Sequence, residues 1–179
     1  MSDWTGVAFS GGTIAIPGAS AGGASADMDA ARAAANASTT WPAANRALFS
    51  PIVVSTTTTF LQMAVIVGTQ SGNLDVGIYD ELGNRLVSAG STAVAAAGVQ
   101  VVNIGDTTVG PGCYFLAMSC DNTTAAFQAV TVPVGLLLQT MGVQQQALGS
   151  VTLPDPATFA NPASAFVPAV FVSTMQATI

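Results

Sequence analysis

Carboxylates are the groups in this 179-residue chain with the most scope for chemistry, because it has nine acidic residues, no histidine and no lysine. The usual general bases for serine and cysteine nucleophiles are therefore missing. Asp75, Asp80 and Glu81 lie close together along the chain and suggest a glycosidase pair, which requires two carboxylates facing each other across a cleft. We expect them instead to be solvated turn acids, as most surface acids are. The sequence predicts no catalytic residue and no enzyme.

Metal and cofactor sites have equally little support. Asp121-Asn122-Thr123 offers oxygen ligands that suit calcium, although Asp-Asn pairs also simply make turns. Asp106-Thr107-Thr108 is similar to the aspartic-protease triplet, but its third residue is not glycine and no second copy is present. A Walker loop needs a lysine, which this chain lacks. In a chain without histidine, two cysteines provide too few ligands for a zinc site. We predict no bound metal and no cofactor, and leave calcium open.

The two cysteines, Cys113 and Cys120, fall in one expected strand. Seven residues of strand separate their Cα atoms by about 23 Å at ~3.3 Å per residue. A disulfide requires less than about 7 Å, so the two cannot bridge each other. We expect free buried thiols, with an intersubunit bridge as the alternative.

Four aromatic residues could stack on a sugar ring, namely Trp4, Trp41, Tyr79 and Tyr114. Tyr79 and Tyr114 lie inside expected strands, where we expect them to fill the interior or an interface. Trp41 precedes Pro42, and we expect it to anchor a linker onto the domain edge. The asparagines of Asn36-Ala37-Ser38 and Asn122-Thr123-Thr124 match the glycosylation sequon, a pattern that is common by chance.

Charge is scarce, at 7% of residues against about 25% in average soluble proteins. The net charge is −6 and the only basic residues are Arg32, Arg46 and Arg85, which disfavours nucleic acid and anionic membranes as partners. No stretch has the ~20 mainly apolar residues of a membrane span. Half of the residues are hydrophobic, so we expect uncharged faces hidden in a closed homo-oligomer, with a trimer favoured.

The expected fold is an all-β, jelly-roll-like antiparallel β-sandwich with extended arms. Alternation with period two predicts strands at 60–67 and 74–79. Gly83-Asn84 predicts a hairpin that pairs the strand through Val76 with one through Val87. The strand at 113–119 is apolar on both faces, so we expect it to be central or covered by another chain. Further strands are expected at 99–104, 134–138 and 166–172. Ser25 and the alanines after it predict a short helix up to Asn36. The predicted divisions are an N-terminal arm with the helix (1–46), the β-sandwich core (47–130), and return strands with a C-terminal extension (131–179).

Several segments together resemble a β-sandwich module of structural proteins from tailed phages and prophages. The resemblance covers residues 41–127, about half of the chain, and its motifs are Trp41 to Ala47, Pro51, Ser71 to Asp80, Gly83 to Gly90 and Gly110 to Ala117. The resemblance implies a non-catalytic virion protein, either a capsid decoration protein or a tail-attached protein that contacts the major capsid or tail protein. The alternative is a glycan-binding, receptor-recognition module of a tail fibre or tail tip. The start, Met1-Ser2-Asp3-Trp4, lacks the features of a secretory signal, so we expect assembly in the host cytoplasm and release by lysis.

Overall fold

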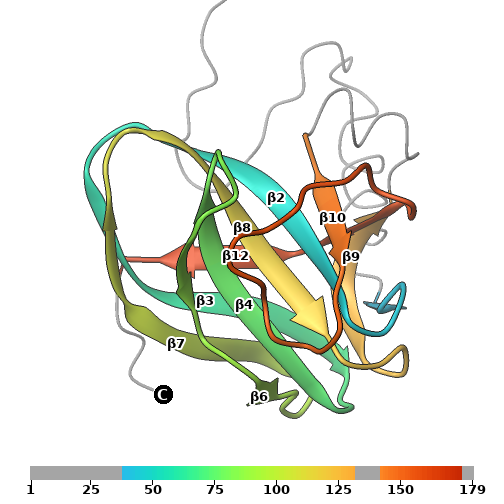
Figure 1. Ribbon diagram of the computed structural model, residues 1–179. Helices are drawn as coiled ribbons and strands as arrows, with labels where there is room; N and C mark the ends of the chain where they lie inside the picture. Colours follow the sequence, from blue (N-terminus) through green and yellow to red (C-terminus); the bar gives the residue numbers. More distant parts are fainter. Residues whose placement is uncertain (1–37, 132–141, 175–179) are drawn as a thin grey trace, which may run out of the picture. The chain divides into compact units, whose positions relative to one another are not determined.

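The computed structural model describes residues 38–131 and 142–174, which belong to one compact unit of the chain, 35–179. These residues form strands and no helix, and the strands make two antiparallel sheets (Figure 1). The all-β class predicted from period-two alternation is therefore confirmed for this part of the chain. The expected arm at 1–24, the helix at 25–36 and the strand at 134–138 lie outside the described residues.

The strands follow one another along the chain with short connections. In order they are β1 (Ser38–Thr40), β2 (Arg46–Val54), β3 (Thr58–Thr69), β4 (Asn73–Asp80), β5 (Arg85–Ser88), β6 (Thr92–Ala93), β7 (Gly98–Val109), β8 (Gly112–Cys120), β9 (Ala126–Thr131), β10 (Gln144–Ala147), β11 (Phe166–Pro168) and β12 (Val170–Ser173).

The long strands alternate between the two sheets. Sheet 1 contains β1, β9, β3 and β7 in that order, and β11 and β12 pair with β9 and β3. Sheet 2 runs β10, β2, β8, β4 and β5, and β6 also pairs with β4. Along the chain only β4, β5 and β6 follow one another within sheet 2, and β11 and β12 within sheet 1, whereas every other connection crosses between the sheets.

The pairings from β1 to β9 are nested around a single turn. Ser38 pairs with Gln128, Arg46 with Cys120, and Asn73 with Ala93, and each of these pairs is centred on Gly83. The pairing of β3 with β7 is centred at or next to the same residue. The segment from β1 to β9 is thus one long antiparallel hairpin, folded so that its successive pairs fall alternately in sheet 1 and sheet 2.

The Asp80 to Asn84 turn closes this hairpin, as the Gly83-Asn84 signal predicts. Gly83 has a φ of 87°, which is in the left-handed region where glycine avoids the steric cost of a side chain. Ile78 then lies opposite Val87, and the Ala89 N–H donates to the Val76 carbonyl. The predicted pairing of the strands through Val76 and Val87 is confirmed.

The two sheets share one apolar core. On β4, alternate residues point into it, and the neighbouring strands of both sheets supply the rest. Its fully buried members include Leu48, Met63, Val65, Leu74, Val76, Ile78, Met118 and Phe127. Trp41 also lies here, 1% exposed, with its ring edge-to-face against Phe127 and Phe166. The expectation that Trp41 sits at the domain edge is therefore wrong, because its indole packs between strands of sheet 1.

Strand β8 is central, as its two apolar faces predict. It lies between β2 and β4, with Leu116 and Met118 in the shared core. Its other face carries Ala117 and Phe115, and a second apolar cluster covers them. From Leu116 to Cys120 both faces are therefore buried within the chain, whereas Cys113 near the start of the strand is exposed.

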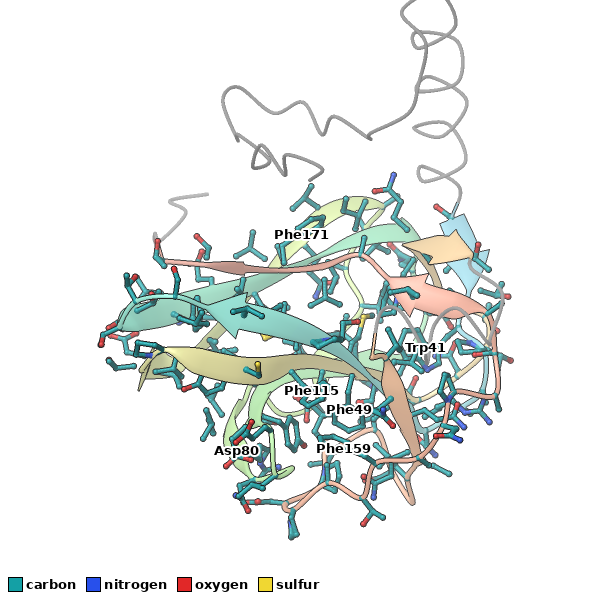
Figure 2. The ribbon with its side chains drawn as sticks, turned by 90° about the horizontal axis from the view of Figure 1, so that it is seen from above. Trp41, Phe49, Asp80, Phe115, Phe159 and Phe171 are labelled. Carbon is teal, nitrogen blue, oxygen red and sulfur yellow. The ribbon has the colours of Figure 1, made fainter. Side chains whose placement is uncertain are left out.

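The second cluster lies on the outer face of sheet 2, opposite the shared core. Residues 148–159, which we call the cover segment, run across this face and contribute Leu148, Leu153, Ala157 and Phe159. Sheet 2 contributes Ala47, Phe49, Tyr79, Phe115 and Ala117. Figure 2 shows Phe49, Phe115 and Phe159 together on this side, with Phe171 on the opposite side of the unit. The proline-rich stretch that follows β10 is therefore packed against the sheet.

Candidate functional site

Asp75 is the most chemically unusual residue of the described structure, because its carboxylate is fully buried. It lies on β4 and faces away from the shared core, beneath the cover segment. Both of its oxygens accept a hydrogen bond from the Ser88 hydroxyl, at 2.9 and 2.8 Å, and Oδ2 also accepts from the Leu153 N–H at 2.9 Å. A buried carboxylate is tolerated only with such partners. The prediction of a solvated turn acid is wrong for Asp75, and its oxygens are used to hold the cover segment.

Three neighbours of Asp75 fasten the same segment. The Tyr79 hydroxyl donates to the Pro154 carbonyl at 2.5 Å, and the Ser119 hydroxyl donates to the Val151 carbonyl. The Arg85 guanidinium donates to the Leu153 carbonyl at 2.6 Å. Side chains of sheet 2 thereby satisfy backbone groups of an irregular segment that has no ladder of its own. These side chains bind the backbone of the cover segment, which lies over them and leaves no open site for a substrate at Asp75.

Burial raises the pKa of Tyr79, and the nearby carboxylates of Asp75 and Asp155 add to this while Arg85 opposes it. A raised folded-state pKa means that the stabilising effect is complete below the unfolded value of about 10 and is lost as the pH rises above it. We therefore expect the urea midpoint to fall above pH 10. In Tyr79→Phe we expect a smaller alkaline fall, together with a loss of about 1 kcal/mol at neutral pH from the missing hydrogen bond. An equal alkaline fall in both proteins would contradict this assignment.

The other two acids of the suggested pair do not meet Asp75 in a cleft. Asp80 and Glu81 line a pocket of about 210 Å³ beside Cys113 and Tyr114, and Asp75 is not among the residues that line it. Partial burial raises the pKa of Asp80, but the N–H groups of Asn84, Leu82 and Gly83 outweigh it and lower the pKa overall. Asp80 and Glu81 are exposed or partly exposed turn acids, as predicted. Two acids from one turn do not face each other, so this pocket lacks the geometry of a glycosidase pair.

Asp121 closes a loop instead of offering free ligands. Its Oδ2 accepts from the backbone and side-chain N–H groups of Asn73, and its Oδ1 accepts from the Asn122 side chain. Partial burial raises the pKa of Asp121, but these hydrogen bonds outweigh it and hold the pKa below its ordinary value. The side-chain oxygen of Asn122, Oδ1, accepts hydrogen bonds from the backbone N–H groups of Thr124 and Ala125. Within 38–131 and 142–174 no three acidic, cysteine or histidine residues gather into a set that could hold a metal ion.

The cysteines are both free, as their strand spacing predicts. Cys120 is buried at the end of β8, and burial raises the pKa of its thiol. Cys113 is exposed at the other end of the strand, so the prediction of a buried thiol is right for Cys120 and wrong for Cys113.

Of the four aromatic residues considered as a sugar platform, two are fully enclosed. Trp41 lies in the shared core and Tyr79 under the cover segment, 1% and 0% exposed. Tyr114 is partly exposed, lines the 210 Å³ pocket and donates its hydroxyl to the Gly110 carbonyl. Trp4 lies outside the described residues. The structure therefore does not bring the three described rings, those of Trp41, Tyr79 and Tyr114, together on one surface.

Sequence reasoning overlooked the side chains that donate hydrogen bonds to Asp75 or to the cover segment. Ser88, Ser119 and Arg85 carry no motif, and the cover segment has no periodicity that would predict packing. One signal was available in Gly77, which lies between Asp75 and Tyr79 on the same face. A Cβ at Gly77 would lie 2.5 Å from the Val87 carbonyl oxygen and 3.0 Å from Leu153 Cδ1. The neighbouring backbone therefore approaches this position closely, and a glycine leaves room for it.

No helix with the length and apolarity needed to cross a membrane occurs in the part of the chain that the structure describes. Comparison of the chain with protein-family models, with curated proteins and with solved structures finds no match to any of them.

Proposed function

We propose that this chain is a non-enzymatic structural protein on the surface of a tailed-phage particle, either a capsid decoration protein or a tail-attached protein. In this proposal its partners are the major capsid or tail protein and further copies of itself, with a trimer favoured as the closed form. It assembles in the host cytoplasm and leaves by lysis. Nucleic acid and membrane are not partners.

The observation that carries the proposal is the nested pairing from β1 to β9. Four successive antiparallel pairings centred on one turn, divided alternately between two sheets, are the connectivity expected of a jelly roll, and we propose this fold for the β1 to β9 segment. Viral capsid domains, lectin domains and cupins all use jelly rolls. Fold alone does not give function, so the chemistry of the surface has to decide between these uses.

The chemistry favours assembly contacts. The most buried carboxylate holds the cover segment, and the other acids near it belong to a tight turn. Several large apolar side chains are exposed on separate strands, including Val53 at 80%, Val99 at 68% and Phe171 at 53%. In a chain with 7% charged residues, such positions suit burial against neighbouring subunits. The resemblance of 41–127 to virion modules points the same way.

The proposal is tested with particles that lack the chain. We expect the purified protein to bind particles from a deletion strain saturably, in a fixed ratio to the major capsid or tail protein, when free and bound protein are separated by sedimentation. Particles that already carry the chain serve as the control and should bind little more. A purified protein that does not bind the deletion particles would contradict the proposal.

Glycan recognition is the second candidate, because lectins also use jelly rolls and Tyr114 lies beside a pocket with Asp80. A tail-fibre or tail-tip module of this kind should bind host surface glycan on an array, and Tyr114→Ala should abolish the signal. Silence of the array at high protein concentration would remove this candidate and leave the first untouched.

A further inference from the structure

Strand β7 differs from every other outer strand of the described structure. Six strands besides β7 pair with one neighbouring strand only, and each is four residues long or shorter: β1, β5, β6, β10 (which is also bridged to Ala160), β11 and β12. Such short edges give another chain little to pair with, and this is how natural sheets avoid unwanted association. Strand β7 has twelve residues and pairs only with β3. It therefore presents by far the longest row of backbone N–H and carbonyl groups without a ladder partner.

Half of this edge is protected and half is not. The register with β3 shifts between Phe60 and Gln62, opposite residues 104–106 of β7, so Asp106 lies within this irregularity. A bulge and a charge are both devices that discourage edge pairing. The preceding stretch, Gly98 to Asn103, is in regular register with β3 and carries no charged residue and no proline. This stretch is the unprotected part.

Within the single chain, hydrogen bonds of the Gln100 side chain already hold the unprotected stretch in an extended conformation. The Gln100 side chain points inward, where its Nε2 donates to the Ala93 carbonyl and its Oε1 accepts from the Ala95 N–H, both at 2.8 Å. The alternate residues Val99 and Val101 lie on the outer face of sheet 1, and Val99 is 68% exposed. An ordered edge loses little conformational entropy when it pairs.

We infer that Gly98 to Val102, within this stretch, pairs with the same residues of a second copy of this chain, antiparallel, about a two-fold axis at Gln100. An antiparallel edge is complementary to itself, and an axis perpendicular to the sheet keeps the outer faces of the two copies on one side. With the axis at Gln100, Val99 of each copy lies opposite Val101 of the other, so both outer cross-strand pairs are apolar. Asp106 then lies beyond the paired stretch. The contact uses an edge and leaves both sheets free, so it can coexist with a three-fold contact elsewhere.

The test replaces the apolar pairs with like charges. In Val99→Lys/Val101→Lys, each lysine faces a lysine of the other copy, which opposes pairing. We expect the mass measured by light scattering to fall to half that of the wild type, whether the wild type is a dimer or a larger even assembly. The control is Thr57→Lys, which adds a charge at an exposed residue of the loop between β2 and β3 and should leave the mass unchanged. An unchanged mass in the double variant would overturn the inference.

A second test does not depend on the charged variant folding normally. Val99→Cys and Val101→Cys are made separately, each with the exposed Cys113 replaced by serine. On mild oxidation we expect a mixture of the two to cross-link between chains and each alone to remain uncross-linked. Absence of cross-links in the mixture, or cross-linking of Val101→Cys with itself, would overturn the pairing at Gln100. These outcomes concern purified protein, so they are independent of whether the chain binds particles.

Discussion

Replacing Trp41 with alanine is expected to lower the free energy of unfolding by about 4 kcal/mol, the largest loss we predict for a single substitution. The indole is 1% exposed and packs edge-to-face on Phe127 and Phe166, with ring centroids 5.7 and 5.3 Å away. Its Nε1 also donates to the Arg46 carbonyl at 3.2 Å. The loss combines buried area, a cavity and an unpaired carbonyl, and it is measured by urea denaturation.

The matched control for this prediction is Trp41→Phe, which keeps a ring in the same place. We expect it to recover about half of the loss, since the cavity is smaller while the hydrogen bond is still absent. A loss below about 1 kcal/mol in Trp41→Ala would contradict the position of this ring in the shared core.

Replacing Asp75 with alanine is expected to cost about 3 kcal/mol, because it leaves the buried Leu153 N–H and the Ser88 hydroxyl without their acceptor. The cover segment should loosen first, so chymotrypsin should cleave after Phe159 faster than in the wild type. The exposed acid of β7 provides the control, and Asp106→Asn should change the free energy of unfolding by less than about 0.5 kcal/mol.

Replacing Asp75 with asparagine separates its structural role from a catalytic one. Asp75→Asn keeps the shape of the side chain and one acceptor oxygen, so we expect it to be more stable than Asp75→Ala. If Asp75 served a glycosidase, a wild-type activity would exist and Asp75→Asn would abolish it with the stability unchanged. That result would contradict the role assigned to this carboxylate.

Much of the two-sheet architecture could be predicted because a strand places successive side chains on opposite faces. One buried face is therefore indicated by Leu74, Val76 and Ile78. The turn that pairs their strand with β5 is indicated by Gly83-Asn84. The polar strand β10, Gln144–Ala147, could not be predicted this way. It is held through its backbone pairing with β2, and its side chains carry no alternation.

The environment of the acids could not be predicted either. Whether Asp75 is solvated or buried depends on what covers the outer face of sheet 2, and that is a segment more than seventy residues further along the chain. The cover segment packs through Leu153 and Phe159 without a repeating pattern, since it has no regular secondary structure that would impose one. Long-range contacts of this kind are invisible to local sequence rules. The same holds for Trp41, whose partners Phe127 and Phe166 are far away in sequence.

The measurement that tests the central claim most directly is immunogold electron microscopy of intact tailed-phage particles made by cells that carry the gene, with an antibody against residues 41–127. The account predicts gold on the particle surface, and none on particles from a deletion strain. Gold over the head would identify a decoration protein, and gold at the tail would identify a tail-attached one. Unlabelled particles, with the chain found only in the host fraction of the lysate, would contradict the account.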